Sequence, residues 1–230
     1  EVVSRDLHLQ ALLTHSTWGD WEWQHSVPQP DPRRYKDTPG ILMTYSFNHA
    51  YTVSSSSTFD AFRTAEGLAA IRHYALNENT MHKDLGYFVS DVERAGPYCM
   101  LGEVLAVANG DPQYIGYLTA ASFQRGFPEH ARAFNAAFLA LPALPSRVLS
   151  EASLPGDIVV REIPAGSHGT YLAVANTGFK ERTDVEVRLP GPGRVFDAVT
   201  GQPLPREGQV LRISLGPCSL RAIHIRPEAR

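Results

Sequence analysis

The stretch Leu141-Pro142-Ala143-Leu144-Pro145-Ser146 divides the sequence into two parts with different hydrophobic patterns. Each proline fixes its own φ and disfavours the helical conformation for the residue before it, so this segment favours extended backbone. Before it, apolar runs are separated by helix-like stretches. After it, short alternating runs follow one another closely. We therefore predict a domain boundary here, between residues 1–145 and residues 146–230.

The composition is that of a folded, water-soluble protein. Hydrophobic residues make up 43% of the 230 residues and charged residues 20%, which excludes disorder, collagen-like repeats and coiled coils as the main architecture. The net charge of -3 leaves no basic excess to neutralise phosphates, so nucleic acid is not an expected partner. A neutral or small anionic ligand fits this charge better.

Cofactor motifs are absent from the sequence. Cys99 and Cys218 lie far apart and lack metal-ligand spacing, so two buried thiols are expected rather than a disulfide framework. His15 and His25 are also too widely spaced to suggest a metal site, and the sequence holds no glycine-rich phosphate loop. We expect no metal or organic cofactor. No apolar run approaches the roughly 20 residues that span a bilayer, and the N-terminal residues do not form a basic segment followed by an apolar one, so no membrane partner is expected.

The first part of the sequence alternates between strand-like and helix-like segments. Strands are predicted over residues 40–46, 70–76, 85–90 and 114–119, and helices over residues 58–66, 98–108 and 128–141. In the last of these helices, Pro128 and Glu129 suit the first turn, and Phe134 and Phe138 lie on one face. This alternation predicts a parallel sheet of βα units, resembling part of a (β/α) barrel.

The second part reads as six short strands separated by Gly, Pro and Asn. They are expected over residues 158–163, 170–176, 184–189, 194–197, 210–215 and 219–225. Glu186 and Arg188 alternate with Val185, Val187 and Leu189, as in a strand with one buried face. The fold class predicted for the whole chain is therefore α/β followed by all-β: a partial barrel-like parallel sheet, then a C-terminal antiparallel β-sandwich.

Polar residues follow the predicted strands of the first part. Asn48 and His49 follow the first strand, Asn77-Glu78-Asn79 follows the second, and Asp91 ends the third. Parallel strands bring such residues to one edge, where α/β proteins build their sites. Glu78 and Asp91 could act there as a pair of catalytic carboxylates, as in glycoside hydrolysis. The alternative is that these are ordinary solvated loop residues.

All three tryptophans lie within six residues, Trp18-Gly19-Asp20-Trp21-Glu22-Trp23. Indole rings beside carboxylates suit a sugar, whose face stacks on the ring while its hydroxyls donate to the acids. Trp18 and Trp21 are therefore candidate substrate contacts. The competing interpretation is a structural cluster that anchors the domain.

Several segments resemble the C-terminal part of barrel-type glycoside hydrolases. In the first part they are the strand ends at residues 45–49, 76–79 and 88–91, followed by the helix at residues 134–142. In the tail they are residues 171–178, 196–204 and 220–223, which resemble the small β domain found beside the barrel in many such enzymes.

A narrower resemblance is to the family 156 exo-sialidases. It implies that the catalytic acid and base lie in early barrel strands, which leaves Asn77 as a late-strand substrate contact. In a glutamate-pair family, Asn77-Glu78 would instead resemble the strand-end Asn-Glu that supplies the acid/base. A complete eight-fold barrel takes about 250 residues, and the sequence starts at Glu1 rather than at a methionine. We therefore expect the chain to be the distal part of a longer protein, so that it lacks the catalytic half if the sialidase resemblance holds.

Two functions remain open at the level of sequence. The first is a glycoside hydrolase, or the C-terminal part of one, that cleaves a terminal sugar such as sialic acid through carboxylate or histidine acid–base chemistry. The second is a non-catalytic carbohydrate-binding or interaction module that uses the tryptophan segment. The expected partner is a carbohydrate in both. The sequence does not determine which sugar is bound, whether the protein forms a homo-oligomer, or where in the cell it is located.

Overall fold

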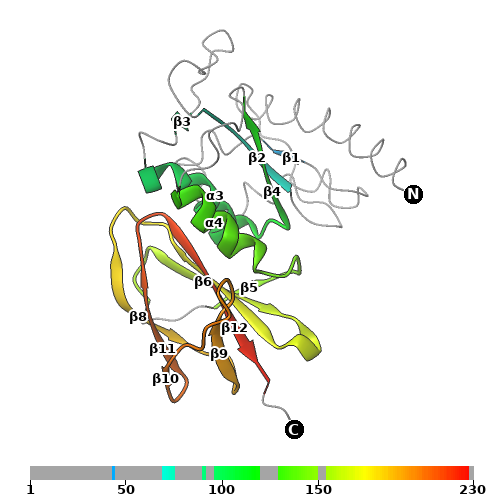
Figure 1. Ribbon diagram of the computed structural model, residues 1–230, viewed down its shortest axis with the longest axis vertical. Coiled ribbons are helices and arrows are strands. Elements are labelled where there is room, and N and C mark those ends of the chain that lie inside the picture. Colours follow the sequence, from blue (N-terminus) through cyan, green and yellow to red (C-terminus); the bar gives the residue numbers. More distant parts are fainter. Residues whose placement is uncertain are drawn as a thin grey trace, which may run out of the picture. The chain divides into compact units, whose positions relative to one another are not determined.

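The computed structural model describes residues 43–44, 69–75, 90–91, 96–119, 129–149 and 154–227 (Figure 1). The chain divides into two compact units. The first unit comprises residues 1–95 and 105–124, and the second comprises residues 96–104 and 125–230. The domain boundary predicted near residue 145 stays a prediction.

The described strands of the first unit form a parallel sheet around β2 (Ala69–Ala75). Strands β1 (Met43–Thr44) and β3 (Ser90–Asp91) pair with opposite ends of β2. Strand β4 (Tyr114–Thr119) pairs along the other edge of β2. All three pairings are parallel, as predicted.

A helical segment predicted over residues 98–108 is present in three successive forms. It begins as a 3₁₀ turn, η4 (Gly96–Met100), continues as α3 (Leu101–Leu105) and ends as a π-helical turn, η5 (Ala106–Gly110). The next residue, Asp111, has a left-handed φ of 50°. That conformation closes the helical segment, which ends at Gly110, two residues beyond the predicted end at residue 108.

Helix α4 (Glu129–Leu139) confirms the helix predicted over residues 128–141. Its buried side chains recur every three residues, at Ala131, Phe134 and Ala137, so they form one apolar face. The helix contacts strand β12 of the second unit. Figure 1 shows the helix running beside that strand.

The second unit is an antiparallel β-sandwich, as predicted. Its larger sheet has the order β5 (Arg147–Val148), β6 (Ile158–Pro164), β7 (Thr170–Asn176), β12 (Ser219–Arg226) and β9 (Arg194–Asp197). Its smaller sheet has the order β10 (Arg206–Glu207), β11 (Val210–Leu215) and β8 (Arg182–Arg188). The six predicted strands are confirmed, and the two-residue strands β5 and β10 were not predicted. A 3₁₀ turn, η7 (Gly166–His168), joins β6 to β7.

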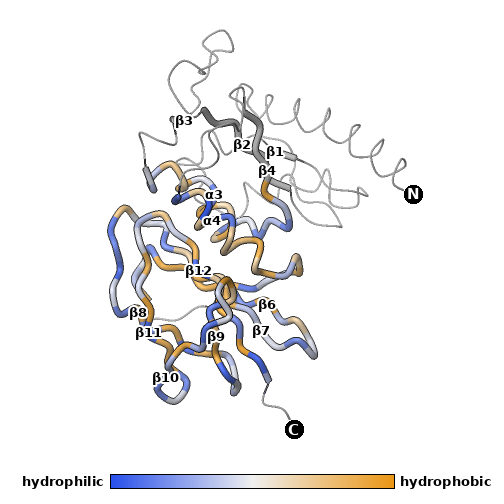
Figure 2. Tube along the Cα trace, viewed as in Figure 1, coloured by the Kyte–Doolittle hydropathy of each residue, from blue (hydrophilic) through white to orange (hydrophobic). Residues whose placement is uncertain are grey.

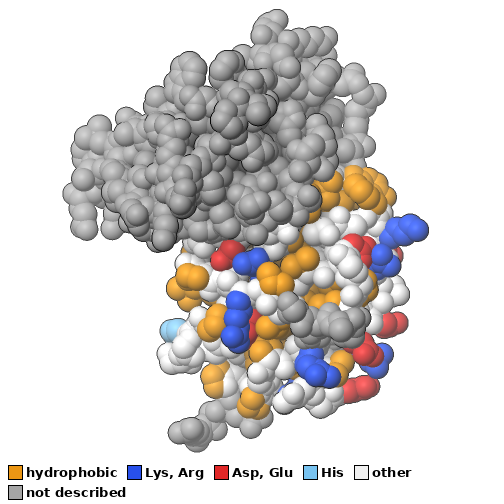
Figure 3. All heavy atoms as spheres, turned by 180° about the vertical axis from the view of Figure 1, so that it is seen from behind, with side chains coloured by type: hydrophobic (Ala, Val, Ile, Leu, Met, Phe, Trp, Pro, Cys, Tyr) orange, Lys and Arg blue, Asp and Glu red, His pale blue; other side chains and the backbone are white. Residues whose placement is uncertain are grey.

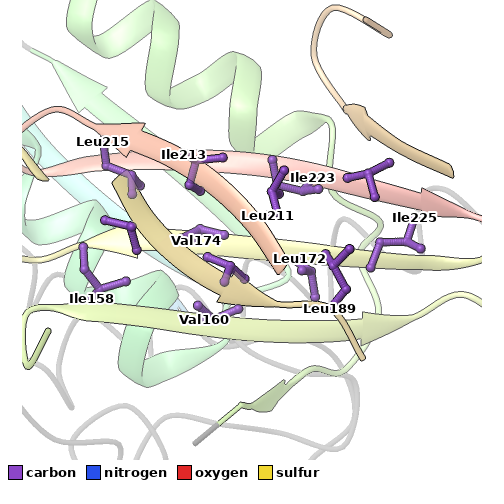
Figure 4. Close-up of a cluster of buried hydrophobic side chains, with 13 residues drawn as sticks. Ile158, Val160, Leu172, Val174, Leu189, Leu211, Ile213, Leu215, Ile223 and Ile225 are labelled. Carbon is purple, nitrogen blue, oxygen red and sulfur yellow. The ribbon is translucent and has the colours of Figure 1, made fainter. Parts of the chain in front are cut away.

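The core lies between the two sheets, where aliphatic side chains from both point toward one another (Figure 4). Val187, Leu211 and Ile223 are among its fully buried members. Along β8 and β11, buried and exposed residues alternate as the sequence predicted, and hydropathy alternates with them in Figure 2. Each of these strands therefore turns one face to the core and one to solvent.

The opposite face of the larger sheet is covered as well. Ala173, Ala175 and Ala222 alternate with core residues along β7 and β12, yet all three are buried. Small side chains permit a helix to approach a sheet closely, and α4 contacts β12. Packing of α4 on the larger sheet therefore accounts for the burial of these alanines, and their small size permits the close approach.

Both cysteines are free and buried, as predicted. Burial raises the pKa of the Cys218 thiol to about 11. At neutral pH this group is therefore a protonated, unreactive core residue.

Candidate active site at the carboxyl edge of the parallel strands

The carboxyl ends of β2, β3 and β4 lie level with one another. Asp91, the last residue of β3, is paired with Ala75, the last residue of β2. On the other edge of β2, Thr119 at the end of β4 is paired with Tyr74. The three strands therefore end at the same edge of the sheet, which is where α/β folds place ligand sites.

The structure positions one of the predicted site residues. Asp91 lies at this edge, at the end of β3. The other candidates lie outside the described residues: Asn48, His49, Asn77, Glu78, Asn79, Trp18 and Trp21. Their convergence with Asp91 stays a prediction.

The second unit contains a thiol–imidazole pair that the sequence did not reveal. The Sγ atom of Cys99 lies 3.3 Å from Nε2 of His130. This pair joins η4 to the first turn of α4, across 31 positions in the sequence. Cys99 is only 6% exposed, so the contact serves to fix η4 against α4. No sequence motif links two residues so far apart.

A second polar feature is a groove of about 340 Å³ along β8, lined among others by Arg182, Asp184 and Glu186. The groove lies beside a β-bulge in β8. Between the pairings with Val185 and Arg182, β8 advances three residues while β11 advances only two. Asp184, within the bulge, has a left-handed φ of 53°. The Arg182 guanidinium is held by Asp157 at 2.7 Å, so the groove has a fixed cation at one side.

Within the described part of the chain, no three His, Cys, Asp or Glu side chains are placed to share a metal ion. Basic and acidic side chains are mixed over the described part of the face shown in Figure 3. No helix among the described residues has the length and apolar character needed to cross a membrane.

No family model matches the sequence, and no curated protein matches it. Several solved structures that resemble the chain are glycoside hydrolases. An α-amylase from Geobacillus thermoleovorans, complexed with acarbose, has a TM-score of 0.52 at 12% identity, over 82% of this chain and 48% of the amylase. An α-amylase from Anoxybacillus has a TM-score of 0.49 at 11% identity, over 83% of this chain and 48% of that one.

A β-L-arabinopyranosidase of family GH27 from Geobacillus stearothermophilus, in complex with arabinose, has a TM-score of 0.40 at 17% identity, over 57% of this chain and 30% of the enzyme. The chain spans about half the length of the amylases it resembles. At these identities the likeness is one of fold, and it is carried by the amylase with the TM-score of 0.52.

Proposed function

We propose that this chain contributes to a glycoside hydrolase, with the carboxyl edge of the parallel strands as part of its active site and the β-sandwich as an attached domain. The observation that carries the proposal is the level ending of β2, β3 and β4, with a carboxylate, Asp91, at the end of β3. The order of parallel sheet before antiparallel sandwich, and the likeness in fold to an α-amylase, support it.

The chemistry requires two carboxyl groups on either side of a glycosidic bond. One protonates the departing oxygen, and the other either attacks the sugar carbon or activates a water molecule. Glu78 and Asp91 are the proposed pair. Glu78 follows Ala75 by three residues, so its Cα lies within about 11 Å of the Cα of Ala75 by chain length alone. That reach would allow a glutamate side chain at position 78 to approach the edge where Asp91 lies.

The remaining candidates supply hydrogen bonds and stacking in this proposal. The amides of Asn48, Asn77 and Asn79 both donate to and accept from sugar hydroxyls. His49 adds ring nitrogens that donate or accept hydrogen bonds. Trp18 and Trp21 offer faces on which a sugar ring stacks.

A panel of aryl glycosides tests the proposal directly. The panel contains α-glucosides, α-galactosides, β-L-arabinopyranosides and an aryl sialoside, because sialic acid is the finer substrate proposal. The chain is assayed both as printed and within any longer natural protein that contains it. Release of the aryl group from one member supports the hydrolase. Tryptophan fluorescence that responds to a sugar without hydrolysis in either form would instead favour a carbohydrate-binding module.

A further inference from the structure

Two arginines stand opposite each other on the larger sheet of the sandwich. Arg194 on β9 is paired in register with Arg226 on β12. Both lie near one aromatic ring: the Cζ atoms of Arg226 and Arg194 are 4.3 Å and 5.4 Å from the centroid of Phe196. Phe196 is 8% exposed, so the ring forms a fixed floor beneath the two exposed guanidinium groups.

The guanidinium of Arg226 is also held from the side. Its Nε donates to Nδ1 of His224 at 3.3 Å, while Nε2 of His224 donates to the carbonyl of His168 at 2.8 Å. A carbonyl can only accept and an arginine nitrogen can only donate, so these two contacts fit the His224 tautomer that carries a proton on Nε2 and accepts at Nδ1. The imidazole is further fixed by stacking on Tyr171, with ring centroids 4.0 Å apart.

The backbone around Arg226 leaves little freedom. A Cβ atom at Gly193 would lie 2.4 Å from the carbonyl oxygen of Arg226, and one at Gly169 would lie 2.2 Å from that of Ile225. Both glycines have positive φ, 143° and 93°. Only glycine permits two chain segments to approach the end of β12 this closely, and their approach fixes where Arg226 emerges.

Within the described part of the chain, this pair differs from several other arginines of the same unit in its lack of a carboxylate partner. Other arginines of the same unit are ion-paired: Arg147 with Glu162, Arg182 with Asp157, Arg212 with Glu186 and Arg221 with Asp197. Among the described residues, no carboxylate pairs with Arg194 or Arg226. Like charges directly opposite on neighbouring strands are destabilising, so a negative partner between them is favoured.

We infer that Arg194 and Arg226, above Phe196, form a binding site for an oxyanion, a carboxylate or sulfate group carried by a ligand. In its contacts with described residues Arg226 donates through Nε, and in this proposal its two terminal nitrogens bind the anion. A guanidinium held in place loses little entropy when it binds, and its fork matches two oxygens at once. The site belongs to the sandwich and does not depend on the proposed hydrolase activity.

The site is tested by titrating the 230-residue chain with sodium sulfate, sodium glucuronate and neutral glucose. Binding is followed through the NMR signals of the arginine Nε–H groups. Arg226→Lys keeps the charge but removes the fork, and Arg194→Lys does the same on the other strand. Arg212→Lys is the matched control, because Arg212 is already paired with Glu186. Thermal unfolding of each variant verifies that it is folded.

The expected result is saturable binding of the two anions, none of glucose, and weakening of about tenfold in Arg226→Lys or Arg194→Lys. Added NaCl should weaken binding, because the site is exposed. Tighter binding of glucuronate than of sulfate identifies an acidic sugar as the ligand type, and equal binding identifies a free oxyanion. Absence of saturation, equal binding of glucose, or equal weakening in Arg212→Lys would overturn the inference.

Discussion

Asp91 lies directly opposite Ala75 in a parallel register, so β2 and β3 end at the same level. Thr119, opposite Tyr74, brings β4 to this level within one residue. Three strands that end together create an edge from which several loops can reach one ligand. Strand pairing therefore places the backbone of Asp91 at this edge.

Replacing either proposed carboxylate should abolish most glycosidase activity. We expect Asp91→Asn and Glu78→Gln each to lower turnover of a cleaved aryl glycoside by about 10²- to 10⁴-fold, because each removes a group that transfers a proton or attacks the sugar. Glu181→Gln, at an exposed position before β8, should leave turnover unchanged. Losses of only a few-fold in both site variants, with the fold intact, would reassign these residues to substrate binding.

A buried amide fixes the turn that follows β7. Asn176 is fully buried, and its Nδ2 donates to the carbonyls of Lys180 and Gly216 while its Oδ1 accepts from the Gly178 N–H. We expect Asn176→Ala to lower the free energy of unfolding by about 3 kcal/mol, because it leaves buried polar groups without partners. Gln202→Ala, which removes an exposed amide, should cost little. Urea unfolding of both variants measures the difference, and equal midpoints would contradict this role.

The strands with the strongest alternation were predictable from sequence because their pattern records burial. Val185, Val187 and Leu189 alternate with exposed residues, and strand β8 (Arg182–Arg188) covers most of this stretch. The parallel pairing of β2 with β1 and with β4 also followed from the helix-like segments between those apolar runs. In contrast, β5 and β10 are two residues long and carry no period of their own.

Long-range polar contacts were beyond prediction from sequence. Cys99 and His130 come together only because η4 packs on α4. Arg194 and Arg226 become neighbours only through the pairing of β9 with β12. The local pattern of a sequence indicates which faces of a strand or helix are apolar. Whether two distant polar groups come into contact depends on strand register and on packing, which a local pattern does not indicate.

Helix α4 buries one aromatic side chain almost completely. Phe134 is 2% exposed, and Leu139, on the same helix, is 80% exposed. Phe134→Ala should lower the free energy of unfolding by about 3–4 kcal/mol through the cavity it leaves. Leu139→Ala should change it by less than about 0.5 kcal/mol. Similar effects of the two substitutions on chemical unfolding would show that this face of α4 is not packed as described.

The ionisation of Asp197 makes the stability of the sandwich depend on pH. Burial raises the pKa of this carboxyl group, but hydrogen bonds from Thr200 and Arg221 outweigh burial and lower the pKa below its ordinary value of 3.8. Its Oδ1 accepts from the backbone of Val199 and Thr200, and its Oδ2 accepts from Arg221 at 2.9 Å. The ionised group therefore holds both the turn after β9 and the neighbouring strand β12.

The sign of the pH effect follows from the lowered pKa. Because the folded protein binds this proton less readily than the unfolded chain, the carboxylate stabilises the fold above the unfolded pKa, and this contribution is lost as pH falls through the folded pKa. Asp197→Asn keeps an oxygen for the turn but loses the charge, so we expect it to unfold more easily by about 1–2 kcal/mol at pH 7. The difference in the free energy of unfolding between the unaltered protein and Asp197→Asn should become smaller below about pH 4. Unfolding curves of both proteins between pH 2 and pH 7 measure this gap, and a gap that stays constant across the range would show that the charge of Asp197 contributes nothing.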